Sequence, residues 1–107
     1  MDLLNLKKMS SKEIEGIIDS SSDIKLNPND YYSALEHRSL AMIFQKSSTR
    51  TRLSFEVAMT QLGGHSIYVD WMTTNLILAD IVDEFKSISG YVDCIIAYFC
   101  FCWCIIY

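Results

Sequence analysis

The central part of the chain changes from the hydrophobic pattern of a strand to that of a helix. Residues 40–44 are an uncharged apolar run, which predicts a buried parallel strand. Over residues 50–62, apolar side chains recur three and four positions apart, as on one face of a helix. This face consists of Leu53, Phe55, Ala58, Met59 and Leu62. We expect Gly63 and Gly64 to end the helix, because glycine accepts the left-handed conformation just past the last turn.

The alternation of strands and helices continues after these glycines. Residues 66–70 and 92–97 predict two further strands. Between them, Asp80 can cap a helix that Gly90 ends. The apolar face of this helix consists of Ile81, Phe85 and Ile88. Strand–helix–strand units at this spacing form parallel sheets with right-handed crossovers. The sequence therefore predicts an α/β fold, with an open parallel sheet and helices on both faces.

The N-terminal third predicts a structural scaffold. Ser10 and Glu13 have the spacing of a capping box at the start of a helix that we expect to end near Asp19. Its apolar stripe consists of Ile14, Ile17 and Ile18. The polar segments 20–23 and 27–30 predict breaks, and the proline of the second segment can open another short helix. The buried side of that short helix would carry Tyr31 and Leu35.

Charge is distributed unevenly along the chain. The formal net charge of the 107 residues is −4. This argues against general nucleic-acid binding, which requires a basic footprint. Three of the nine Lys and Arg residues nevertheless fall close together, at Lys46, Arg50 and Arg52. Such a local concentration of positive charge suits a small anionic ligand better than a polymer.

The two arginines lie where a helix disfavours positive charge. Arg50 and Arg52 would occupy the first turn of the 50–62 helix, where the helix dipole makes each cation unfavourable by roughly 0.3–1 kcal/mol. The hydroxyls of Ser48 and Thr49 can cap this helix start. An anion bound here would reverse the unfavourable electrostatics. Backbone N–H groups, hydroxyls and guanidinium groups would then converge on a site the size of a phosphate.

The carboxyl-terminal stretch from residue 94 to residue 107 has no charged residue. It is shorter than the roughly 20 residues of a membrane-spanning helix, and it has the composition of an aggregation-prone segment. All four cysteines lie in this stretch, at Cys94, Cys100, Cys102 and Cys104. Their spacing does not match a zinc motif, so we expect no metal site, and a reduced, cytoplasmic chain. A membrane-associated peptide is a third-ranked alternative.

The motif that starts at residue 48 identifies a resemblance. Ser48-Thr-Arg-Thr-Arg52, followed by Ser54-Phe-Glu56 and Leu62-Gly-Gly64, resembles the carbamoyltransferase family. The flanking segments are most similar to ornithine carbamoyltransferases; they are residues 40–44, 57–65 and 91–93. Aspartate carbamoyltransferases share the core of the motif. The resemblance runs from about Leu3 to Ala97.

The resemblance implies a set of site residues. In the family, the residues that match Ser48, Thr49, Arg50 and Thr51 bind the phosphate of carbamoyl phosphate. The one that matches Arg50 also has a catalytic role, because it stabilises charge near the reacting carbonyl. The implied reaction transfers the carbamoyl group to ornithine, giving citrulline and phosphate, without a cofactor. We expect structural roles for Arg52 and Glu56, which would tie the helix to its surroundings.

The sequence also departs from the family pattern. The family is homotrimeric, and a neighbouring subunit offers a polar or basic side chain to the phosphate; Thr74 is the candidate counterpart here. The family has an arginine where this chain has Tyr98. We expect this chain to lack the family's downstream His-Pro-x-Gln element and the domain that binds the amino acid.

These departures define the expected domain organisation. We expect residues 1–97 to be a truncated or frameshifted carbamoyl-phosphate-binding domain and residues 98–107 to be an aberrant apolar tail. Such a chain should be nearly inactive alone. The alternatives are a fragment of an aspartate carbamoyltransferase and a non-catalytic phosphate-binding module.

Overall fold

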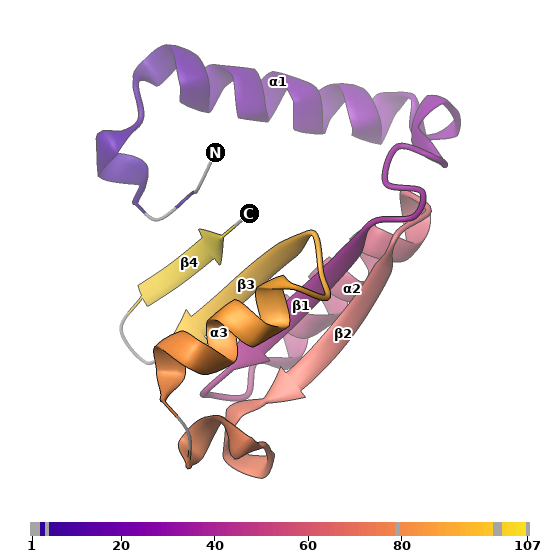
Figure 1. The fold of residues 1–107 in the computed structure, drawn as a ribbon. Coiled ribbons are helices and arrows are strands. Elements are labelled where there is room, and N and C mark those ends of the chain that lie inside the picture. Colours follow the sequence, from indigo (N-terminus) through magenta and orange to yellow (C-terminus); the bar gives the residue numbers. More distant parts are fainter. Residues whose placement is uncertain (1–2, 4, 79, 100–101, 107) are drawn as a thin grey trace.

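The computed structural model describes residues 3, 5–78, 80–99 and 102–106 (Figure 1). Its main elements, in chain order, are α1 (Ser11–Leu26), β1 (Ser39–Phe44), α2 (Thr49–Gln61), β2 (His65–Asp70), α3 (Ile81–Ser89), β3 (Cys94–Phe99) and β4 (Cys102–Ile106). Short 3-10 helices cover Leu6–Lys8, Pro28–Tyr31, Trp71–Thr73 and Asn75–Ile77. The predicted strand–helix order of the central part is confirmed.

The four strands form one sheet in the order β2-β1-β3-β4. The central strand β1 runs parallel to both β2 and β3, and β4 pairs antiparallel with β3. Phe44, the last residue of β1, is in register with Asp70 of β2 and Tyr98 of β3. The carboxyl ends of the three parallel strands therefore lie along one edge of the sheet, which is the edge where open α/β folds bind ligands.

Side chains of β1 alternate between two apolar clusters, one on each face of the sheet. Leu40, Met42 and Phe44 pack with Met59 of α2 on one face. Ala41 and Ile43 face the other side, where Phe85 of α3 packs against the same cluster. Figure 1 shows α2 and α3 on opposite sides of the strands. An uncharged run with both faces covered is typical of a central parallel strand, so the predicted α/β fold class is confirmed.

Helix α2 buries a narrower face than its sequence predicted. Met59 is buried, and Phe55 packs half-buried against the α2-side cluster, whereas Leu53 is 53% exposed. The helix ends as expected, because Gly63 has φ +84°. A Cβ atom at this position would also lie 2.5 Å from the carbonyl oxygen of Tyr32, so glycine is required both by conformation and by space.

Helix α1 is longer than predicted, and the expectation of an end near Asp19 was wrong. The capping box is confirmed, since Ser10 and Glu13 bond reciprocally. The segment expected to break the helix contains Ser20, Ser21 and Ser22. Their hydroxyls donate to the backbone carbonyls four residues earlier, at 2.8, 2.7 and 2.9 Å. These bonds let a serine run continue a helix instead of breaking it.

The apolar stripe of α1 is mostly exposed, since Ile17 and Ile18 are 43% and 57% accessible. Among the described residues, the main tertiary contacts of α1 are with the Pro28–Tyr31 turn, where the Tyr31 hydroxyl donates to Asp23. Figure 1 shows α1 standing apart from the layers around the sheet.

The third parallel strand extends past its predicted end. It covers Cys94–Phe99 instead of residues 92–97, so the predicted domain boundary after Ala97 falls inside β3. The described part of the following segment forms β4 along the β3 edge. Residues 100, 101 and 107 lie outside the described residues. The division into a domain over 1–97 and a tail over 98–107 stays a prediction.

Asp93 connects the start of β3 to the start of β1. Its carboxylate accepts hydrogen bonds from Arg38 Nη1 at 2.8 Å, from the backbone N–H of Ser39 at 2.9 Å and from the Ser39 hydroxyl at 3.1 Å. The bond from Arg38, followed by those from Ser39, holds the pKa of Asp93 below its ordinary value of 3.8. The ionised carboxylate is therefore the form that the fold stabilises.

This shift gives a pH-dependent prediction. A carboxyl group whose pKa is lower in the folded state stabilises the protein above its unfolded pKa, and the stabilisation disappears as the pH falls through the folded pKa. Asp93→Asn should therefore lower the free energy of unfolding at neutral pH but not at a pH below the folded pKa. Urea titrations over a pH series measure this, with Asp19→Asn on the exposed face of α1 as the control. An equal effect of Asp93→Asn at every pH would contradict the prediction.

Candidate functional site

The loop from residue 45 to residue 48 connects the carboxyl end of β1 to the first turn of α2. Its start is fixed to the neighbouring strand, because the N–H of Gln45 donates to the carbonyl of Tyr98 at 2.9 Å. Strand β2 ends at the same edge and leads into the segment that contains Thr74. The structure therefore places the predicted anion-binding motif at the carboxyl edge of the parallel strands, where open α/β folds bind ligands.

Ser48 is the N-cap residue of α2, but its side chain does not cap the helix. The expectation that its hydroxyl caps a backbone N–H was wrong: Ser48 Oγ donates instead to Thr51 Oγ1 at 2.9 Å. The first N–H groups of a helix have no carbonyl partner within it. Without a side-chain cap, the amides at the start of α2 can donate to an anion, and the two linked hydroxyls lie beside them.

The two arginines of the motif have different surroundings. Arg50 is exposed to solvent. Arg52 Nε lies 2.9 Å from Glu56 Oε1, one helical turn along α2. Its guanidinium carbon also lies 3.8 Å from the centre of the Tyr68 ring, which comes from β2. These contacts place Arg52 between a carboxylate and an aromatic face. The supporting role of Arg52 and Glu56 stays a prediction.

A pocket of about 300 Å³ lies at the start of α2. It is lined by Ser47, Ser48, Thr49, Arg52, Leu53, Glu56 and Tyr68. The structure thus brings together four of the predicted site residues, namely Ser48, Thr49, Arg52 and Glu56. Arg50 and Thr51 belong to the same helical turn but do not line this pocket.

Tyr68 was not found by sequence reasoning. Its position could have been derived from two periodicities: β2 is in register with β1, and Tyr68 pairs with Met42, whose side chain faces α2. Strand alternation therefore directs Tyr68 toward the helix that carries Arg52. What the sequence does not contain is the distance between these two side chains.

Thr74 and Tyr98 have contacts within their own chain. Thr74 Oγ1 lies 3.3 Å from the carbonyl of Trp71, and Thr74 does not line the pocket at the start of α2. The Tyr98 ring packs edge-on against Phe44 with centroids 5.5 Å apart. The aromatic residue at position 98 therefore belongs to the apolar cluster under the loop, and it brings no positive charge to the site.

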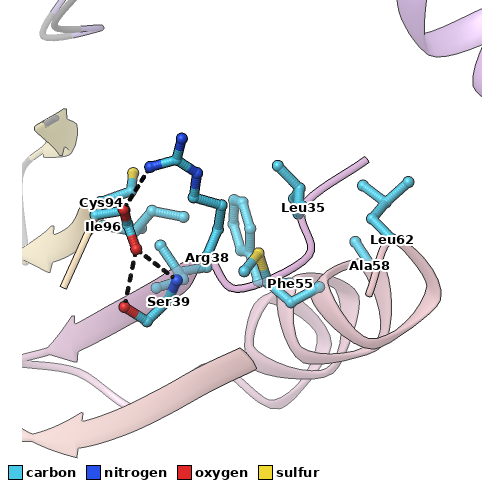
Figure 2. Close-up of a pocket in the computed structure, with 11 residues that line it drawn as sticks. Leu35, Arg38, Ser39, Phe55, Ala58, Leu62, Cys94 and Ile96 are labelled. Carbon is cyan, nitrogen blue, oxygen red and sulfur yellow. Dashed lines mark hydrogen bonds and ion pairs between the residues drawn. The ribbon is translucent and has the colours of Figure 1, made fainter. Parts of the chain in front are cut away.

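A second, larger hollow lies at the opposite edge of the sheet, and Figure 2 shows its lining. Its volume is about 440 Å³, and apolar side chains dominate it, among them Leu35, Phe55 and Ile96. The one cation in its lining, Arg38, is paired with Asp93. The arginine of the pocket at the start of α2 is paired as well, so the pairing does not distinguish the two pockets. Because the larger hollow is mainly apolar and does not contain the start of a helix, a phosphate fits the pocket at the start of α2 better.

No group of three or more His, Cys, Asp or Glu side chains that could hold a metal ion occurs in the described part of the chain. Within those same residues, no helix combines the length and the hydrophobicity needed to span a membrane.

Comparison with known proteins agrees with this architecture. Residues 1–98 match the family model described as "Aspartate/ornithine carbamoyltransferase, carbamoyl-P binding domain". The chain belongs to the aspartate/ornithine carbamoyltransferase family. It is 38% identical over 96 residues to the catabolic ornithine carbamoyltransferase of Halobacterium salinarum, which covers 89% of this chain and 32% of that protein.

Solved structures of both branches of the carbamoyltransferase family resemble this chain. The ornithine carbamoyltransferase of Pyrococcus furiosus superposes with a TM-score of 0.82 and 42% identity, over 90% of this chain and 32% of that one. The catalytic subunit of the aspartate transcarbamoylase of M. jannaschii superposes with a TM-score of 0.78 and 35% identity, over 89% of this chain and 32% of that one. The chain thus spans about a third of the length of these carbamoyltransferases.

Proposed function

We propose that the start of α2 binds the phosphate group of carbamoyl phosphate. We further propose that the complete protein transfers the carbamoyl group to ornithine, giving citrulline and phosphate. The observation that carries this proposal is the uncapped helix start at the carboxyl edge of the sheet, with the Ser48 and Thr51 hydroxyls beside it. A phosphate is stabilised at such a place by backbone N–H groups, by hydroxyl donors and by the helix dipole.

Each residue of the motif has a distinct role in the proposed site. Thr49 and Thr51 donate hydrogen bonds to phosphate oxygens, and Ser48 does so by turning its one O–H from Thr51 to the anion. Arg50 supplies the charge-assisted bonds that a dianion requires. Arg50 is also the catalytic residue, because a guanidinium beside the carbonyl stabilises the negative charge that develops when the amine attacks. No side-chain nucleophile takes part, so rate acceleration comes from positioning and from electrostatics.

The second substrate and the assembly are also part of the proposal. Ornithine is favoured over aspartate by the flanking residues, such as the Gly63-Gly-His65 segment, although relatives of both kinds match the chain. In a homotrimer, Thr74 of a neighbouring copy would approach the phosphate from outside the chain. A cytoplasmic location and the absence of nucleic-acid and membrane partners stay predictions from the sequence, and the absence of a cofactor stays a prediction from the family resemblance.

The function predicts binding without turnover for this chain. Isothermal titration with carbamoyl phosphate should give saturable binding at one site per chain, and excess inorganic phosphate should compete for it. Incubation with carbamoyl phosphate and ornithine should yield no citrulline, since this chain spans only about a third of the length of the carbamoyltransferases that it matches. Absence of carbamoyl phosphate binding would contradict the proposed site, and citrulline formation at an enzymatic rate would contradict the view that this chain carries only part of a carbamoyltransferase active site.

A further inference from the structure

We propose that Glu56 limits the affinity of the phosphate site for anions, by cancelling the charge of Arg52 inside the pocket at the start of α2. Arg52 is in this view a second guanidinium of the phosphate site, whose effect on the anion Glu56 weakens. Tyr68 fixes the position of Arg52. This inference rests on the proposed function and assigns a specificity-determining role to Glu56 and a positioning role to Tyr68.

The pocket lining contains one positive and one negative side chain beside the hydroxyl loop. Arg52 and Glu56 line it together with Ser48 and Thr49. Their side chains are 45% and 32% exposed, so the pair is accessible from the pocket. The bond to Glu56 uses Nε of Arg52, and a guanidinium has several further N–H donors. A phosphate in this pocket would therefore meet a cation that is partly committed to a carboxylate.

Electrostatics gives the sign of the effect. A carboxylate within the same pocket as a bound dianion repels it, and its partner arginine offsets this repulsion only in part. Replacing Glu56 by glutamine removes the negative charge and keeps the shape of the side chain. The bound anion should then be attracted by the full positive charge of Arg52. At the short distances within one partly solvated pocket, the expected gain in affinity is about threefold to tenfold, and it should shrink at high ionic strength.

Tyr68 keeps Arg52 in this pocket. The guanidinium carbon lies 3.8 Å from the ring centre, close enough for a favourable contact between the cation and the aromatic face. The ring is itself held in place, because it packs edge-on against Phe44 with centroids 5.4 Å apart. When Glu56 is neutralised, the ring therefore remains as the contact that stops Arg52 from turning into solvent.

The test is a comparison of inorganic phosphate binding to the full chain and its variants. Glu56→Gln should tighten binding about threefold to tenfold. The double variant Arg52→Gln, Glu56→Gln should lose this gain. Two further double variants combine Glu56→Gln with a change at Tyr68. Tyr68→Phe keeps the aromatic ring and should retain the gain in phosphate affinity, whereas Tyr68→Leu should reduce this gain. Glu15→Gln, the same chemical change on the exposed face of α1, is the control for net charge and should have no such effect.

The direction of the change separates the inference from a purely structural role. If Glu56 served only to hold α2 in place, Glu56→Gln would weaken phosphate binding or leave it unchanged, and either result would overturn the inference. Thermal unfolding of each variant, followed by circular dichroism, shows whether weaker binding reflects a damaged fold. If the parent chain binds phosphate and Glu56→Gln does not tighten it, only this inference fails. If the parent chain binds no phosphate, the proposed function fails as well.

Discussion

Phe44→Ala should lower the free energy of unfolding by about 3–5 kcal/mol, which is the usual cost of removing a buried phenylalanine side chain. Phe44 is 1% exposed and is among the largest fully buried side chains of the described structure. It ends β1, and its ring makes edge contacts with Tyr68 and Tyr98 at centroid distances of 5.4 and 5.5 Å. The substitution would remove these contacts and leave a cavity under the anion-binding loop.

Equilibrium unfolding in urea measures this loss. Domains of this size are stable by only about 5–15 kcal/mol, so the substitution should remove a large share of the total. Tyr91→Ala is the matched control, because Tyr91 is an aromatic residue that is 86% exposed. Its replacement should change the stability by no more than about 0.5 kcal/mol. A loss below about 1 kcal/mol for Phe44→Ala would show that the ring is not part of a packed core.

Arg50→Ala should weaken carbamoyl phosphate binding by about ten- to a hundredfold, the usual effect of removing a hydrogen bond to a charged group. The guanidinium offers two parallel N–H donors to phosphate oxygens, whereas lysine offers a point charge. Arg50→Lys should therefore fall between the parent and Arg50→Ala. Arg50 is exposed in the first turn of α2, so neither substitution should change the thermal unfolding temperature.

Titration calorimetry with carbamoyl phosphate measures these affinities. Lys12→Ala is the control, because it removes one positive charge from an exposed position of α1. It should leave the affinity unchanged at physiological salt, where charges farther apart than about 8 Å are screened. Equal affinities for the parent and Arg50→Ala would contradict the assignment of Arg50 as a phosphate ligand.

The central sheet could be predicted from the sequence because its signals are local. An uncharged five-residue run requires burial on both faces, and periodic apolar positions followed by glycine define a helix and its end. The positive φ of Gly63 and the cap at Asp80 are the observed counterparts of those signals. The structure confirms these elements within one or two residues at most ends.

Other features depend on which of several possible partners a side-chain hydroxyl bonds to, and the sequence does not specify that partner. The serines at positions 20–22 favour turns by composition, yet in α1 their hydroxyls bond to carbonyls of the preceding turn and the helix continues. Serine is a favoured N-cap residue, yet the Ser48 hydroxyl donates to the hydroxyl of Thr51 and not to a backbone group. Strand β4 has no polar alternation to mark it, and it becomes visible only through its pairing with β3.

The candidate site likewise combines a feature that the local sequence predicts with a contact that only the tertiary structure reveals. The motif over residues 48–52 predicted an anion site from its charges and hydroxyls alone, because two arginines at the wrong end of a helix require a compensating anion. The contact between Arg52 and Tyr68 joins residues of different elements, α2 and β2. Only the packing of the helix against the sheet brings them together, so no local pattern could specify it.

The most direct test of the central claim is a titration of the ¹⁵N-labelled chain with carbamoyl phosphate, followed by two-dimensional NMR. If the start of α2 binds the phosphate group, the amide signals of Thr49, Arg50 and Thr51 should move furthest, with one saturable binding curve. The signals of residues that line the apolar hollow at the opposite edge, such as Leu35 and Ala58, should stay in place. Saturable shifts centred on that hollow, with unmoved signals at residues 49–51, would contradict the account.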